Sequence, residues 1–232
     1  MGPTLSFKLT SAAGTTAREV AIRRAVIAGW TARDRAAMEA HIAELEELGV
    51  ARPARTPIFY RVAASRLTQA GAIEAIGGAS SGEVEFCLVN IDGGIWVGVG
   101  SDHTDREAEA QGVTLSKQLC DKPVAGELWC LDELAPHWDS LEITAHAVID
   151  GHRILYQQGP VTAMLSPQRL LELFAAEDAE GGLGPGDIMM CGTLPAIGGV
   201  RPAARFEFAL ADPVAGRTIA HGYDVIELPV EG

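Results

Sequence analysis

Short runs of hydrophobic residues, separated by polar turns, cover most of the chain, and this pattern predicts strands more often than helices. Residues 18–30 are rich in Val and Ile, which favour strands, and are predicted to form one. We predict that Thr31 then caps a helix that runs to about Leu48, with Asp34 near its start. Residues 51–57 contain two prolines and two arginines and are interpreted as a linker.

Turn signals separate the apolar runs from residue 58 onward. Asp150-Gly151 is a strong signal for a β-hairpin, and residues 212–216 predict the turn of a final hairpin. Ser166-Pro167 predicts the start of a helix. Because strands dominate without regular strand–helix alternation, the chain is expected to have an α+β fold that is mostly β.

The linker divides the chain into two predicted parts. Residues 1–56 are expected to form a strand–helix segment that serves as a lid or flank, and residues 57–232 a metal-binding catalytic core. A chain of 232 residues that is 47% hydrophobic can bury one large core, with or without such an appendage.

Composition and charge narrow the class of protein. No apolar stretch approaches the roughly 20 residues needed to cross a bilayer, and the N-terminus lacks the layout of a signal peptide, so a soluble protein without a membrane partner is expected. A net charge of −13 argues against a nucleic-acid partner. The four cysteines form no C-x-x-C pair, which predicts neither a zinc site nor disulfides and favours a cytoplasmic location.

Two acidic residues on one predicted strand are the first candidates for chemistry. Because side chains alternate along a strand, Glu83 and Glu85 point the same way, roughly 6–7 Å apart at their Cα atoms. They repel each other unless a cation lies between them, and hard cations such as Mg²⁺ and Mn²⁺ prefer oxygen ligands. The alternative is a strand whose acidic face meets solvent.

Asp102 follows the glycine-rich strand predicted over residues 95–100. It is either the N-cap of a short helix or, if its strand is the neighbour of the strand that bears Glu85, the third carboxylate of a metal site. His103 is a possible fourth ligand, although we interpret it as a neighbour of the site.

An ordered set of short motifs lies within residues 57–200: an acidic pair, an Asp followed by Thr and Arg, a Lys, and two glycine-containing turns, namely Glu83-Val84-Glu85, Asp102-x-Thr104-x-Arg106, Lys117, Gly186-Asp187-Ile188 and Gly192-Thr193-Leu194-Pro195. This ordered set is similar to the fumarylacetoacetate hydrolase superfamily, in a divergent bacterial branch. The chain departs from the superfamily in a short spacing between Glu85 and Asp102, in Leu194 inside the usual Gly-Thr-Pro, and in lacking a lysine after Phe59-Tyr60.

The resemblance implies a rolled, barrel-like mixed β-sandwich of the superfamily's C-terminal-domain type, with a few short helices. It also implies Mg²⁺ or Mn²⁺ bound by Glu83, Glu85 and Asp102. Such a cation chelates a 2-oxo acid and stabilises an enolate as a Lewis acid. A homodimer is expected on the same basis.

The resemblance further assigns residues to the substrate. Lys117 is expected to stabilise a developing oxyanion or to bind a substrate carboxylate, the alternative being a surface lysine. Gly192 and Thr193 are expected to bind the substrate, the alternative being an ordinary glycine-rich turn. Arg106 and Tyr60 are further candidates for substrate binding.

The base that activates water is sought on the helix predicted from Thr31. His41 and Glu44 are three residues apart, so they share a helix face, where a carboxylate raises the basicity of an imidazole. A His-x-x-Glu on an N-terminal lid helix plays this part in small members of the superfamily. The alternative is a routine ion pair on a solvated helix.

The function predicted is hydrolysis of a C–C bond in a β-diketo or acylpyruvate-type 2-oxo acid, a small carboxylic acid, through an enolate. Decarboxylation, hydration and isomerisation of a 2-oxo acid share that enolate and stay open as alternatives. A non-catalytic ligand-binding protein of the same fold is a rival from another class. A cupin-like metal barrel is a weaker rival because the sequence has no His-x-His pair.

Overall fold

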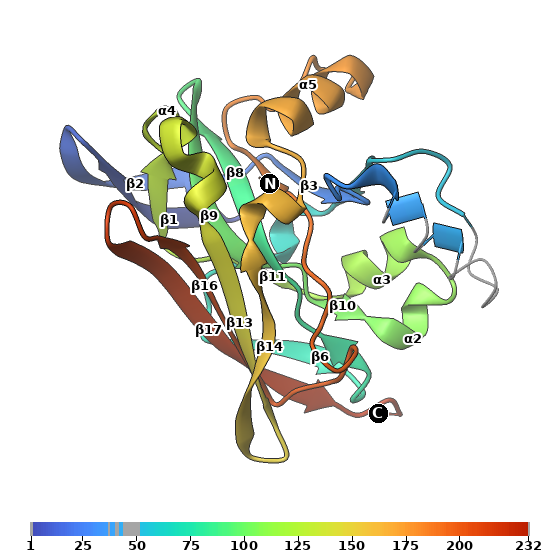
Figure 1. The fold of residues 1–232 in the computed structure, drawn as a ribbon. Helices are drawn as coiled ribbons and strands as arrows, with labels where there is room; N and C mark the ends of the chain where they lie inside the picture. The colour runs from blue at the N-terminus through green and yellow to red at the C-terminus, as the bar shows by residue number, and fades with distance from the viewer. Residues whose placement is uncertain (1, 37, 40–41, 44–51, 232) are drawn as a thin grey trace.

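The structure is a computed structural model that describes residues 2–36, 38–39, 42–43 and 52–231. It is built mainly from strands, with a few short helices at the periphery (Figure 1), so the predicted α+β, mostly-β class is confirmed. Among the described residues, no helix combines the length and the apolar character needed to cross a membrane.

The larger sheet has eight strands in the order β2–β1–β12–β9–β8–β15–β3–β4. Most neighbours are antiparallel, but β1 with β12 and β15 with β3 are parallel, so the sheet is mixed. Its strands are β1 (Thr4–Ser11), β2 (Gly14–Ala21), β3 (Arg24–Gly29), β4 (Ile58–Val62), β8 (Val84–Ile91), β9 (Gly94–Ser101), β12 (Glu127–Cys130) and β15 (Asp187–Met190).

The smaller sheet has five strands in the order β14–β13–β16–β17–β6. They are β6 (Ala72–Ile76), β13 (Glu142–Ile149), β14 (His152–Pro160), β16 (Arg205–Asp212) and β17 (Arg217–Leu228). Two pairs of short strands complete the β structure, β5 (Leu67–Thr68) with β11 (Lys122–Pro123) and β7 (Ser80–Ser81) with β10 (Thr104–Asp105).

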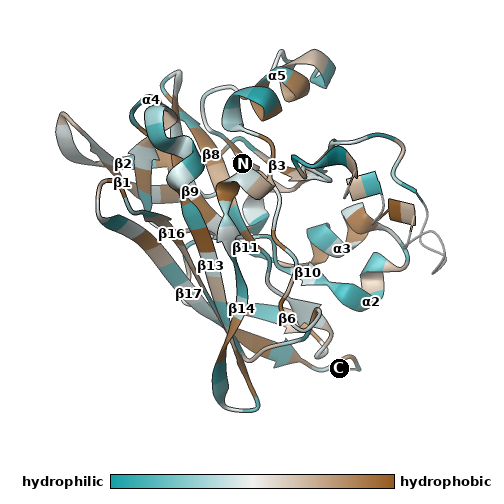
Figure 2. Ribbon diagram, in the orientation of Figure 1, coloured by the Kyte–Doolittle hydropathy of each residue, from teal (hydrophilic) through white to brown (hydrophobic). Residues whose placement is uncertain are grey.

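The helices are short. Between residues 52 and 231, the α-helices are α2 (Arg106–Glu109), α3 (Val113–Leu119), α4 (Leu131–Leu134) and α5 (Pro167–Glu177), and 3₁₀ turns cover Ala64–Arg66, Ala135–Ser140 and Val161–Ala163. Figure 2 shows brown, hydrophobic stretches along the inner strands and teal, polar stretches on the outlying helices.

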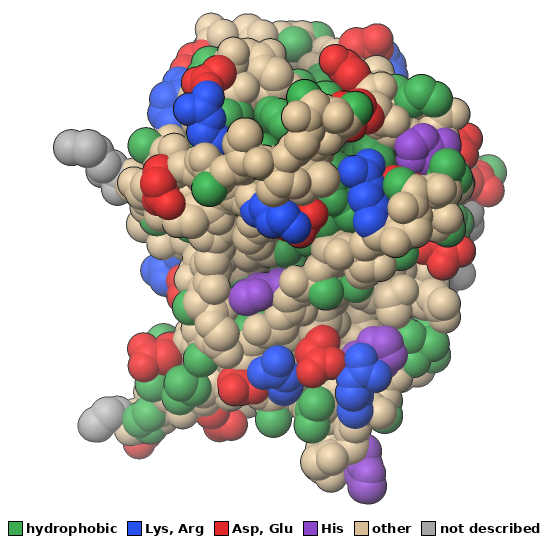
Figure 3. Space-filling model, turned by 90° about the vertical axis from the view of Figure 1, so that its left-hand side faces the viewer, with side chains coloured by type: hydrophobic (Ala, Val, Ile, Leu, Met, Phe, Trp, Pro, Cys, Tyr) green, Lys and Arg blue, Asp and Glu red, His purple; other side chains and the backbone are tan. Residues whose placement is uncertain are grey.

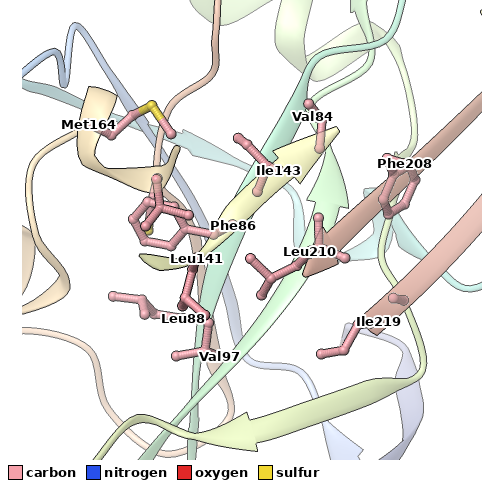
Figure 4. Close-up of a cluster of buried hydrophobic side chains, with 14 of the residues drawn as sticks. Val84, Phe86, Leu88, Val97, Leu141, Ile143, Met164, Phe208, Leu210 and Ile219 are labelled. Carbon is pink, nitrogen blue, oxygen red and sulfur yellow. The ribbon is translucent and has the colours of Figure 1, made fainter. Parts of the chain in front are cut away.

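The main core lies between the two sheets. Figure 4 shows Val84, Phe86 and Leu88 of β8 meeting Ile143 of β13 and Leu210 of β16. The intervening residues of β8, among them Cys87 and Val89, pack into a second cluster on the other side of the sheet. The predicted alternation of β8 is therefore confirmed, and burial on both faces makes this strand a rigid support for the side chains at its start.

Both predicted turns and the predicted helix start are confirmed. Asp150 and Gly151 have φ angles of 51° and 76°, as a tight hairpin turn between β13 and β14 requires. The second hairpin joins β16 to β17. The Ser166 side chain accepts a hydrogen bond from the Arg169 backbone N–H and so caps α5.

The strand predicted over residues 18–30 is wrong as one element, because the chain changes partners in its middle. The Ile22 N–H donates to the Pro3 carbonyl at 2.9 Å, whereas the next residue, Arg23, donates to Gly186 at 2.7 Å. The first half therefore pairs with β1 as β2, and the second half pairs with β15 and β4 as β3.

The predicted cap at Thr31 is also wrong. Residues 35–36, 38–39 and 42–43 are helical, and the Asp34 side chain accepts a hydrogen bond from the Ala36 N–H at 2.9 Å. The Thr31 hydroxyl instead donates to the Cys191 carbonyl, 3.0 Å away, which joins the end of β3 to the segment after β15.

The boundary predicted at residue 56 does not separate two sheets. Strands β1, β2 and β3 from the first part and β8 and β9 from the second part belong to the same sheet. On the face in Figure 3, the blue, red and purple side chains of cationic, acidic and histidine residues are interspersed.

Candidate metal centre

Three carboxylates converge where β8 begins and β9 ends. The two strands are antiparallel neighbours that pair Glu85 with Gly100, and the Asp102 N–H donates to the Glu83 carbonyl at 2.9 Å. Asp102 thus extends the ladder by one residue. Carboxylate oxygens of Glu83, Glu85 and Asp102, here called the carboxylate cluster, all lie within 4.8 Å of one another. The structure therefore brings together the three residues that the sequence assigned to a metal.

Burial makes this convergence costly for two of the three. Glu85 is 2% exposed and Asp102 is fully buried. Burial and the charge of Asp102 raise the pKa of Glu85 well above its ordinary value, although the Gly192 N–H donates to its Oε2 at 2.8 Å. Burial alone would also raise the pKa of Asp102, but the charges of two lysines outweigh it and lower this pKa.

The first of these lysines is Lys117 on α3. Its ammonium donates to Asp102 Oδ2 and lies 3.6 Å from Glu83 Oε2. Burial alone would lower the pKa of Lys117, but the charges of Asp102 and the two glutamates raise it above its ordinary value. The alternative of a surface lysine is wrong, because Lys117 is only 7% exposed.

The second lysine, Lys122, was missed by the sequence reasoning. It is fully buried at the start of β11, where its ammonium donates to the His103 carbonyl and lies 3.1 Å from Asp102 Oδ1. A signal was present in the composition: the chain has three lysines, and two of them stand five residues apart shortly after Asp102. In a chain with so few lysines, each lysine is a candidate for a specific buried role.

The structure decides between the alternatives for the segment after β9. The N-cap of α2 is Asp105, which accepts the Ala108 N–H at 2.9 Å, so Asp102 is not the cap. The ring of His103 contacts the Tyr223 hydroxyl and Ser80 Oγ, each at 2.8 Å. Because these contacts occupy both ring nitrogens, His103 is a neighbour of the carboxylate cluster and not a ligand in this arrangement. Burial, with the charge of Lys122, lowers the pKa of His103 to about 3 and keeps the ring neutral.

The predicted substrate residues Gly192 and Thr193 support the carboxylate cluster through hydrogen bonds to Glu85 and to the start of β8. Gly192 has φ of +95°, and a Cβ there would lie 1.8 Å from Thr31 Oγ1, so only glycine fits. The Thr193 hydroxyl donates to the Val84 carbonyl at 2.8 Å and accepts from Gln157 Nε2 at 2.8 Å. These contacts fix the start of β8, and their predicted contact with substrate stays a prediction.

The other predicted substrate residues flank the cluster. Arg106 Nη2 lies 3.1 Å from Glu83 Oε1, and its Nε donates to Ser81 Oγ at 2.7 Å. Tyr60 lies on β4. Burial raises the pKa of its hydroxyl, and the charges of Lys117 and Asp102 also act on this pKa. The predicted catalytic pair His41 and Glu44 lies outside the described residues.

The donor set fits a hard divalent cation. Three carboxylates face three cationic side chains, Lys117, Lys122 and Arg106, so the site is formally close to neutral without a metal. Asp102 Oδ1 nevertheless makes no hydrogen bond and has only the ion pair with Lys122. Carboxylate oxygens that converge in this way, with one lone pair unused, match the ligands preferred by Mg²⁺ and Mn²⁺.

Comparison with known proteins gives one family match. Residues 28–223 match the family described as "Protein of unknown function (DUF2848)". No curated protein matches the sequence.

Several solved structures share the fold. "Crystal structure of Cg1458 with inhibitor" has a TM-score of 0.66 and 18% identity, and covers 91% of this chain and 81% of that one. A 2-keto-3-deoxy-D-arabinonate dehydratase, complexed with magnesium and 2,5-dioxopentanoate, has a TM-score of 0.63 and 15% identity over 92% and 77% of the two chains. The 4-oxalocrotonate decarboxylase from Pseudomonas putida G7, complexed with calcium and acetate, has a TM-score of 0.56 and 17% identity over 89% and 78%.

These structures are members of the fumarylacetoacetate hydrolase superfamily, so the fold expected from the resemblance is confirmed. At 15–18% identity the likeness establishes the fold. What the carboxylate cluster does has to be argued from its own chemistry.

Proposed function

The chain belongs to the family described as "Protein of unknown function (DUF2848)", and from its fold and its carboxylate cluster we propose that it is a divalent-metal-dependent enzyme acting on small 2-oxo acids. The observation that carries the proposal is the convergence of three carboxylates within 4.8 Å at the ends of two paired strands. Two of the three are buried, where like charges repel strongly. Lysine and arginine side chains balance these charges from the side, while the oxygens converge as the ligands of a shared cation do.

Glu83, Glu85 and Asp102 would hold Mg²⁺ or Mn²⁺. When bound, the cation supplies a Lewis acid for the adjacent carbonyl and carboxylate oxygens of a 2-oxo acid. The similar dehydratase and decarboxylase structures hold magnesium and calcium, which supports a hard cation here as well.

The chain's own cations would act on the substrate and on the cluster. Lys117, held between Asp102 and Glu83, places an ammonium where negative charge develops on a substrate oxygen. Arg106 restrains Glu83 through one ion pair, and Lys122 restrains Asp102 through another. Gly192 and Thr193 keep Glu85 and the start of β8 in place.

The reaction proposed is hydrolysis of the C–C bond of an acylpyruvate. Water adds to the acyl carbonyl, the bond to the pyruvyl methylene breaks, and the electron pair passes to that methylene as an enolate. Protonation of the enolate gives pyruvate, and the acyl group leaves as a carboxylic acid. Activation of the water by His41 and Glu44 stays part of the proposal, as do the homodimer and the cytoplasmic location.

Decarboxylation or dehydration of a 2-oxo acid is the second candidate. It is favoured by the activities named for two of the similar structures, a decarboxylase and a dehydratase. Both reactions use the same enolate, so the carboxylate cluster serves either. A panel of an acylpyruvate, oxaloacetate and a 2-keto-3-deoxy sugar acid, assayed with the same enzyme preparation, separates the candidates.

Metal binding is tested by calorimetric titration of metal-stripped protein with Mg²⁺ and Mn²⁺. We expect Asp102→Asn and Glu83→Gln to weaken binding by at least the roughly 10–100-fold that changes outside the ligand set cost. Glu74→Gln, an exposed acid on β6, is the matched control and should bind as the unchanged protein does. Full metal affinity in both cluster variants, or turnover of no compound in the panel, would overturn the proposal.

A further inference from the structure

A hollow of about 450 Å³ opens beside α3, and we call it the Trp30 hollow. Its lining includes Trp30, Pro53, Tyr60, Val113, Thr114 and Leu115. Its volume lies within the range of roughly 300–1,000 Å³ that is usual for small-molecule sites. None of the described residues that line it carries a charge at neutral pH.

The aromatic wall of the hollow is held in an unusual conformation. Trp30 has φ of +58°, which is strained for a bulky side chain and persists only where the surroundings enforce it. The next residue is tied down on both sides: the Thr31 hydroxyl donates to Cys191, and its carbonyl accepts from the Leu165 N–H. Trp30 also hydrogen-bonds the Tyr60 side chain, whose ring lies against Gly29.

The hollow lies next to the carboxylate cluster along α3. Val113 and Thr114, which line it, stand four and three residues before Lys117 and therefore share its side of this helix. Tyr60 connects the two regions from the other side, because it lines the hollow and also feels the charges of Lys117 and Asp102. A compound whose polar end lies at the carboxylate cluster therefore has the hollow next to it.

We infer that the Trp30 hollow binds the distal part of the substrate and selects an uncharged, apolar substituent such as a phenyl ring or a branched alkyl group. The inference rests on the proposed function, because the cluster is taken to bind the 2-oxo acid end. A distal carboxylate would be placed against apolar and aromatic side chains without a cationic partner among the described lining residues, which is unfavourable.

Binding of two 2-oxo acids tests this inference. The probes are 2-oxo-4-phenylbutanoate, which ends in a phenyl ring, and 2-oxohexanedioate, which ends in a carboxylate. Neither has the second ketone carbonyl that water attacks in an acylpyruvate, so neither is hydrolysed as one. With the Mg²⁺-loaded protein, calorimetry should show that the phenyl compound binds about tenfold or more tightly than the diacid. Pyruvate, which has no distal group, reports on the carboxylate cluster alone.

Two leucines of α3 supply a matched pair of variants. Leu115 and Leu119 are 45% and 42% exposed and stand one turn apart, but only Leu115 is among the residues that line the hollow. Leu115→Asp should weaken binding of the phenyl compound about tenfold. Leu119→Asp should leave it unchanged. Since both side chains are partly exposed, both variants are expected to fold, and their melting temperatures check this.

Tryptophan fluorescence gives a second readout. The phenyl compound should change the emission of the unchanged protein, and Trp30→Phe should remove most of that change while Trp96→Phe keeps it. Tighter binding of the phenyl compound, lost only in Leu115→Asp, supports the inference. Equal or tighter binding of the diacid, or the same loss in both leucine variants, overturns the inference about the hollow. If pyruvate still binds in that case, the proposed function is unaffected. Failure of all three compounds to bind overturns both.

Discussion

The two ends of β15 each carry a buried cluster of charges, and the two clusters are built in different ways. At its start, Arg24 of β3 lies beside Asp187 and also reaches Asp178, and we call these three residues the arginine cluster. Beyond its end, the chain reaches the carboxylate cluster through the hydrogen bond from Gly192 to Glu85. About five strand residues separate them, or roughly 17 Å.

The arginine cluster pairs each carboxylate with a guanidinium. Arg24 is 3% exposed, and it donates to Asp187 Oδ2 at 2.7 Å and to both oxygens of Asp178 at 3.0 Å. A planar guanidinium forks between acceptors and separates them. In the carboxylate cluster, by contrast, acidic oxygens approach one another within 4.8 Å, and two ammonium groups and one guanidinium contact them from the side.

An unpaired oxygen does not distinguish the clusters. Asp187 Oδ1 lacks a hydrogen bond just as Asp102 Oδ1 does. Only Glu83, Glu85 and Asp102 meet the geometric condition for a shared cation within the described part of the chain. We therefore interpret the arginine cluster as a structural support and the carboxylate cluster as a binding site, because its acidic oxygens converge on one another.

Removal of Arg24 should give the largest effect on stability. Arg24→Met leaves Asp187 buried without its main partner, so the free energy of unfolding should fall by about 3–5 kcal/mol, measured by urea denaturation. Arg23→Met is the matched control, since the neighbouring Arg23 side chain is 45% exposed and should cost about 1 kcal/mol or less. Equal losses in the two variants would contradict a special role for the buried arginine. Metal affinity should be unchanged in Arg23→Met.

Neutralising Glu85 should have the opposite sign in the metal-free protein. The pKa of Glu85 is raised in the folded protein, mainly by burial and then by Asp102, so its contribution is present below the unfolded pKa and is lost as pH rises through the folded pKa. Glu85→Gln should therefore be more stable than the unchanged protein by about 1–2 kcal/mol at neutral pH.

The pH dependence checks this sign. The stability difference between Glu85→Gln and the unchanged protein, obtained from denaturation between pH 4 and pH 8, should shrink towards zero at the acidic end. Saturating Mg²⁺ should reverse the order, because the variant loses a ligand. A difference that stays constant with pH would show that the Glu85 charge is not the cause.

Exposed ion pairs should give the smallest effect. Glu207 accepts from Arg153 and Arg205, with side chains 30%, 55% and 38% exposed. These residues line a shallow hollow on the smaller sheet. Glu207→Gln should change the free energy of unfolding by about 0–1 kcal/mol in chemical denaturation, with a change that diminishes in high salt. A larger, salt-independent loss would show that burial does not decide how much these ion pairs contribute to stability.

Local features of the sequence predicted much of the fold. A period of two placed Glu83 and Glu85 on one side of β8, and the Asp150-Gly151 turn and the Ser166 cap needed only nearby residues. Where partners are distant, the same reasoning was less successful. It merged β2 and β3 into one strand, because the change of partner at Arg23 depends on Gly186, far along the chain.

The candidate site divides in the same way. The acidic pair and the position of Asp102 at a strand end were evident in the sequence. The role of Lys122 was not, because its ammonium reaches Asp102 only through the fold of β11 against β9. The Trp30 hollow is assembled from the residue after β3, from β4 and from α3, and no local sequence pattern predicts it.

By itself, the sequence determined which side chains share a strand face and where turns and caps fall, since these depend on backbone geometry over a few residues. Only the tertiary structure decided that Asp102 meets Glu83 and Glu85, that two lysines pair with Asp102, and that Trp30 and Leu115 line one hollow. The physical reason is that strand pairing and burial are set by contacts between distant segments, whose free energies depend on the whole packed core.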